Sequence, residues 1–89
     1  MNTTIIKSSE LREGDLIALH NCVVRLGEIK SRATAEPDYP VFWSTATVVE
    51  HDPKGIPGSY LDTAEDGSRT WQVQGNDRAT WHKIGEDHV

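Results

Sequence analysis

The chain of 89 residues lacks most of the sequence features of membrane proteins, of secreted proteins and of small proteins stabilised by disulfides. Cys22 is its one cysteine, so no disulfide can form within the chain. No apolar run approaches the roughly 18 residues that a membrane-spanning helix needs. The first residues also lack the basic segment followed by an apolar segment that marks a signal peptide. We therefore expect a cytoplasmic protein with no membrane partner.

Basic residues are also scarce. Lysine and arginine together number 9 against 14 acidic residues, and the net charge is −5. Phosphate contacts need clustered cations, so this balance disfavours nonspecific binding to nucleic acid. An acidic surface is easier to reconcile with a protein partner than with nucleic acid.

The spacing that metal and phosphate sites require is missing as well. The histidines are His20, His51, His82 and His88, and none of them forms a His-x-His or His-x3-His pair. The acidic segment 62–67 lacks the oxygen ligands that a calcium loop places at set positions, and no glycine-rich loop opens a helix. The sequence predicts no metal, no cofactor and no catalytic residue, and we expect Cys22 to be a buried, unreactive core residue.

Short apolar segments with the alternation of β-strands are what the chain does contain. Helical periodicity is nearly absent, so we predict an all-β fold of one domain over 1–89. It would be a small antiparallel SH3-like barrel or a strongly bent sheet of five to six strands, because closure removes exposed edges. A long irregular segment is expected at 52–69 and a loose tail at 85–89. The predicted strands cover 16–20, 22–29, 41–51, 70–75 and 78–84, the last two as a hairpin.

Residues 7–17, which read Lys-Ser-Ser-Glu-Leu-Arg-Glu-Gly-Asp-Leu-Ile, carry a resemblance. Gly14 permits the positive φ that leads into a strand, and Asp15 can cap the turn. This opening, with a tryptophan-bearing last hairpin, resembles small SH3-like barrels and uncharacterised proteins of bacteriophages and actinobacteria. The resemblance implies a small barrel and no catalytic residue, and it suggests a phage-encoded accessory or host-interacting protein.

Aromatic residues supply the candidate contact surface. They are Tyr39, Phe42, Trp43, Tyr60, Trp71 and Trp81. Trp81 fits strand alternation worst, because Ile84 lies three residues on and cannot share its face without a bulge. Loops carry binding residues disproportionately, and 52–69 is too long to be a mere connector. We therefore predict a contact surface of Trp81, Arg78 and Tyr60, with core packing of Trp81 as the alternative.

The predicted function is that of a noncatalytic protein-binding module, not an enzyme. One alternative is a small barrel that binds single-stranded nucleic acid by aromatic stacking. Its phosphate contacts would come from Arg25, Lys30, Arg32 and Arg78. A second alternative is a small enzyme of unknown reaction, and self-association through a strand edge is a further way in which the chain could find a partner.

Overall fold

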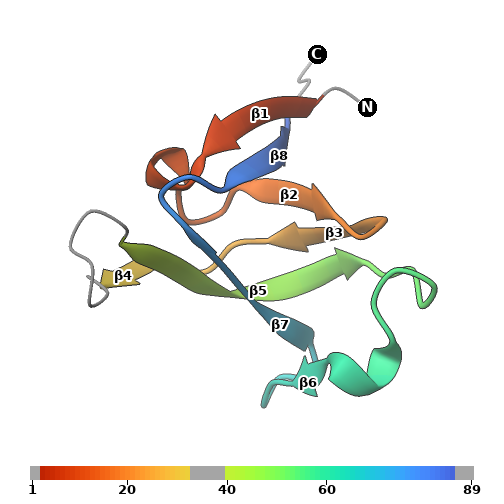
Figure 1. Ribbon diagram of the computed structural model, residues 1–89. Helices are drawn as coiled ribbons and strands as arrows, with labels where there is room; N and C mark the ends of the chain where they lie inside the picture. The colour runs from red at the N-terminus through yellow and green to blue at the C-terminus, as the bar shows by residue number, and fades with distance from the viewer. Residues whose placement is uncertain (1–2, 33–39, 86–89) are drawn as a thin grey trace.

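The computed structural model describes residues 3–32 and 40–85 and has an all-β fold (Figure 1). Its strands form one antiparallel sheet that is not closed, in the order β1-β8-β2-β3-β5-β7-β6, with β4 beside β5. The strands are β1 (Thr3–Lys7), β2 (Leu16–Leu19), β3 (Cys22–Arg25), β4 (Lys30–Arg32), β5 (Val41–Glu50), β6 (Asp62–Thr63), β7 (Arg69–Asn76) and β8 (Thr80–Ile84). Two short 3-10 turns, η1 (Ser8–Glu10) and η2 (Gly58–Tyr60), complete the described elements.

The all-β prediction is confirmed, whereas the expected number of strands is too low. The sheet has 8 strands, and the three that the sequence analysis missed are β1, β4 and β6. Strand β4 reads Lys-Ser-Arg and has no apolar residue, so only its pairing with β5 makes it a strand. In the part of the chain that the structure describes, no helix is long and apolar enough to cross a membrane.

The predicted C-terminal hairpin is wrong. Strand β7 pairs with β5 and β6, whereas β8 pairs with β1 and β2. A tight turn, in which the Ala79 amide donates to the Asn76 carbonyl at 3.1 Å, carries the chain from one part of the sheet to the other. Alternation of apolar and polar residues indicates where strands lie but not which strands become neighbours, so the turn was mistaken for a hairpin loop.

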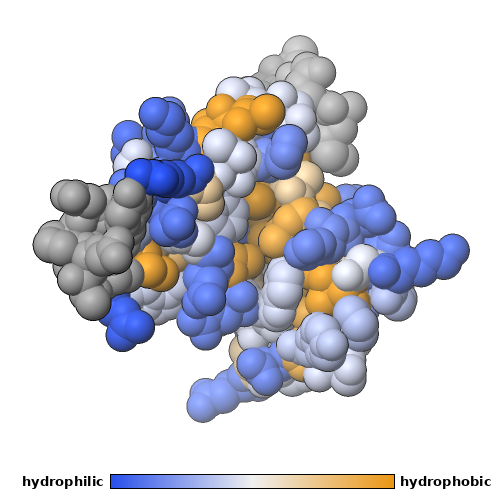
Figure 2. Space-filling model, viewed as in Figure 1, coloured by the Kyte–Doolittle hydropathy of each residue, from blue (hydrophilic) through white to orange (hydrophobic). Residues whose placement is uncertain are grey.

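The hydrophobic core lies inside the bend of this sheet. Strands from β1, at one end of the sheet order, to β7, next to the other end, contribute to one cluster, so the sheet curls around it. Figure 2 shows hydrophobic residues over β1 and through the middle of the same face. The buried cluster consists of Ile6, Leu11, Ile17, Val24, Leu26, Ala46, Val73 and Trp81.

Trp81 belongs to this core, and the expectation that it faces outward is wrong. Its side chain is 7% exposed, and the indole Nε1 donates to Ser8 Oγ at 2.8 Å. The β1–β8 pairing runs without a register shift, so no bulge turns the ring inward. Ile84 lies on the opposite face and is buried there too. Strand β8 is therefore covered on one face at Trp81 and on the other at Ile84, so the two residues need not share a face.

The segment 52–69 is folded onto the sheet. The amides of Gly55 and Ile56 donate to the carbonyl of Asp52 at 2.9 and 3.0 Å, and Ile56 is fully buried. A turn over 65–67 joins β6 to β7, with Gly67 at a φ of 88°. The tail predicted at 85–89 is described only at Gly85. Tyr39 and His88 lie outside the described residues.

Candidate functional site

The structure does not bring the three predicted contact residues together. Tyr60 is 66% exposed in η2, which Arg69 anchors to the start of β7 by donating from Nη2 to the Gly58 carbonyl at 3.0 Å. Arg78 is exposed in the turn beyond the other end of β7. A strand of 8 residues spans about 25 Å, so Tyr60 and Arg78 lie far apart. Trp81 is buried, as described above.

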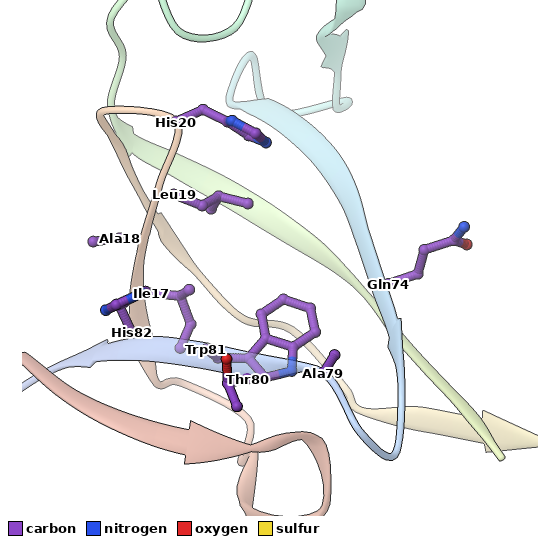
Figure 3. A pocket seen from close by; sticks show the side chains of 9 residues that line it. All are labelled: Ile17, Ala18, Leu19, His20, Gln74, Ala79, Thr80, Trp81 and His82. Atoms are coloured by element: carbon purple, nitrogen blue, oxygen red, sulfur yellow. The ribbon is translucent and has the colours of Figure 1, made fainter. Parts of the chain in front are cut away.

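An open groove lies between β2 and β7, where the sheet does not close (Figure 3). It is made of two adjoining hollows of about 320 and 490 Å³, which share Leu19, His20, Gln74 and Trp81. In Figure 3, Leu19 and His20 extend from β2 toward β7, and the indole of Trp81 lies at the base between β8 and β7. The groove therefore has an apolar floor with an indole ring at its centre.

The turn after β2 positions the upper wall of the groove. His20 and Asn21 both have left-handed φ values, 50° and 62°, as a two-residue hairpin turn requires. The turn holds the His20 ring 5.8 Å from the ring of Trp71, edge to face at 65°. One wall of the groove thus touches the other at this end, through an aromatic contact.

One side of the groove is the free edge of β7. Strand β6 pairs with β7 only at Arg69 and Thr70, so among the described strands none pairs with residues 71–76 on the side away from β5. Four consecutive residues of β7, 71–74, line the groove. An unpaired strand edge presents backbone N–H and C=O groups that another chain can pair with.

The described residues that line the groove carry no fixed charge. They include no aspartate, glutamate, lysine or arginine, and the titratable groups among them are His20 and His82. Within residues 3–32 and 40–85, no group of three His, Cys, Asp or Glu side chains is placed to hold a metal ion. Such a lining suits the burial of apolar side chains and backbone hydrogen bonding.

Cys22 lies away from the groove and is buried as predicted, with 1% of its surface exposed. The Asp52 amide donates to its Sγ at 3.2 Å, and the thiol donates back to the Asp52 carbonyl at 3.6 Å. The sulfur therefore ties β3 to the segment that follows β5.

The sequence singled out Trp81 as a candidate site residue, but it did not indicate most of the other residues that line the groove. Leu19, His20 and Gln74 belong to segments far apart in the chain, and only the bend of the sheet brings them together. Asn21 after the apolar segment 16–20 indicated a turn, although His20 was assigned to the strand and belongs to the turn. Nothing in the sequence indicated that this turn would meet Trp71.

Comparison with known proteins found no relative. No protein-family model matches the chain, and no curated protein or solved structure is significantly similar to it. The resemblance of residues 7–17 therefore stays a prediction, and function is inferred from the groove itself.

Proposed function

We propose that the chain is a noncatalytic protein-binding module that takes an extended segment of its partner into the groove between β2 and β7. The observation that carries this proposal is an apolar floor directly beside an unpaired strand edge. A peptide that adds a strand to β7 would pair with the free backbone groups, which supply affinity. Its alternate side chains would point to the floor, where Leu19, Trp71 and Trp81 would select apolar groups.

We further propose an SH3-like barrel for the fold and an accessory or host-interacting role in a bacteriophage. Two features support the barrel. Strand β8 returns to pair with β2, which curls the sheet around one core. At the resembling opening, Gly14 has a φ of 91° and the Arg12 amide donates to Asp15 Oδ2 at 3.0 Å. The phage role rests on the resemblance of residues 7–17, and we propose the cytoplasm as its location.

A random-peptide display selection tests the groove. We expect enriched peptides with alternating apolar residues, and we expect their binding to slow amide hydrogen exchange at residues 71–76. The variant Leu19→Asp places a charge on the floor, and we expect it to bind the enriched peptide at least tenfold more weakly. Val49→Asp is the matched control, because Val49 is an exposed apolar residue of β5 outside the groove.

Three results would refute the proposal. One is the failure of any peptide to be enriched. Another is equal binding by Leu19→Asp and the native chain. The third is protection from exchange that avoids residues 71–76, and this measurement on the native chain decides the matter if Leu19→Asp does not fold.

A further inference from the structure

The outward face of β5 is a second surface, which borders the groove at Gln72 and Gln74 of β7. Ser44 and Ala46 of β5 are buried, so Trp43, Thr45 and Thr47 point away from the core. Opposite residues of antiparallel strands share a face, and this places three cations along the outward side of β5. The pairs are Arg25 with Thr47, Lys30 with Trp43, and Arg32 with Val41.

Trp43 stands between two hollows on this face. Each hollow has a volume of about 190 Å³. Lys30 lines the first hollow, and Arg32 lines the second together with the amide side chains of Gln72 and Gln74. The guanidinium carbon of Arg32 lies 5.9 Å from the centroid of the Trp43 ring, so a cation is already held against the indole.

The charge of this face differs from that of the whole chain. Arg25, Lys30 and Arg32 are exposed and cover about 20 Å, the length of the β5 segment 41–47. Over this stretch, the acids among the described residues are Glu28, which lines the first hollow, and Asp62, which the register places in line with Arg25; Glu50, opposite Val23, lies beyond it. Among the described residues opposite 41–47, three cations against two acids leave a surplus of one positive charge, whereas the chain as a whole carries −5.

We propose that this face binds single-stranded nucleic acid. Unpaired bases enter the hollows on either side of Trp43 and stack on its indole, and Arg32 turns from the ring to a phosphate as they do. Arg25, Lys30 and Arg32 bind three phosphates of the strand. Gln72 and Gln74 offer amide donors and acceptors to the base edges. Bases in a duplex are stacked on each other and cannot enter, and an acidic peptide would use the cations but leave the hollows and the indole unused. The proposal rests on Trp43 and the three cations, none of which lines the groove, and it shares only Gln72 and Gln74 with the groove.

The test is the fluorescence anisotropy of a labelled 12-nucleotide oligothymidine at 50 and 200 mM salt. Three phosphate contacts on a single strand predict a slope of log affinity against log salt of about −2, which is about 20-fold weaker binding at the higher salt. We expect the double variant Lys30→Gln/Arg32→Gln to reduce the slope to about −0.7. Arg12→Gln/Lys54→Gln is the control, because it removes the same charge from exposed residues off this face and is expected to keep the native slope.

Trp43→Leu separates stacking from charge. We expect it to weaken binding at least about fivefold and to leave the salt slope unchanged, because it removes the stacking surface and no cation. Unlabelled duplex of the same length and a 12-residue polyglutamate are expected not to compete. The proposal is overturned if no binding occurs at 50 mM salt, if either competitor displaces the oligonucleotide as well as unlabelled oligothymidine does, or if Trp43→Leu binds like the native chain. Thermal melting confirms that each variant is folded.

Discussion

At the scale of single residues, Ser8 shows how one hydroxyl joins distant parts of the chain. It is 1% exposed, accepts from the indole of Trp81 and donates to the Asn76 carbonyl at 2.7 Å. Ser8→Ala would leave a buried indole N–H without an acceptor, which costs about 1–3 kcal/mol. We expect the free energy of unfolding, measured in urea, to fall by that amount.

The neighbouring serine provides the control for this prediction. Ser9 is exposed in the same turn, so Ser9→Ala should change stability by no more than about 0.5 kcal/mol. Equal stabilities of the Ser8 and Ser9 variants would show that the buried hydrogen bonds contribute nothing.

A second prediction for single residues concerns Asp66 in the turn between β6 and β7. Ser68 donates to its carboxylate from Oγ at 2.6 Å and from the backbone amide at 2.9 Å, and these bonds lower the pKa of Asp66. A lowered folded-state pKa means that the carboxylate stabilises the turn above the unfolded pKa. That stabilisation is lost as the pH falls through the folded pKa.

An NMR titration of the Asp66 carboxyl carbon measures this directly. We expect a midpoint below that of an ordinary exposed aspartate. In Ser68→Ala the midpoint should rise toward the ordinary value, because the hydroxyl is the larger of the two causes. An unchanged midpoint in Ser68→Ala would contradict the assignment.

At the scale of elements, the turn over residues 52–56 covers Cys22 and packs on the turn after β2. A Cβ on Gly55 would overlap the carbonyl oxygen of His20, so Gly55→Ala should push the covering turn away. We expect a thiol reagent to label native Cys22 far more slowly than the denatured chain, and to label it faster in Gly55→Ala.

Gly58→Ala is the matched control for the labelling experiment. Its new Cβ would meet the flexible end of Arg69 at 3.4 Å and the His51 ring at an ordinary contact distance of 3.9 Å, so the turn should stay in place. If Gly55→Ala and Gly58→Ala are labelled at the same rate, the turn does not control access to the sulfur.

The positions of five strands, among them the two longest, β5 and β7, could be predicted from the sequence, but their partners could not. Segments such as 41–51 and 16–20 are apolar and β-branched enough to be recognised within a residue or so. Strand β4 has no apolar residue, and β6 has only two residues, so tertiary pairing alone defines them. For the candidate sites, too, single residues could be recognised from the sequence but their neighbours in space could not. Lys30 and Arg32 were recognised as candidate phosphate contacts, but their placement around Trp43 depends on the register with β5.

At the scale of the whole molecule, the sheet has a well-paired centre and exposed ends. Strand β5 pairs with β3, β4 and β7, whereas β1 and β6 lie at the ends of the sheet order. Amide groups that open only on global unfolding exchange most slowly. We therefore expect the slowest hydrogen exchange in β5 and much faster exchange in β1 and β6, measured by NMR. Protection in β1 equal to that in β5 would show that this end is covered in solution.

Strand β8 has a consequence for how the chain acquires its structure during translation. It places Trp81 in the core and bridges β1 and β2, which lie at the other end of the sequence. During translation, residues 80–84 must emerge from the ribosome before the core around Ile6 and Ile17 can form. Assembly therefore waits for β8 and requires closure of the long loop between β1 and β8. Such a topology is typical of folding in milliseconds to seconds rather than microseconds.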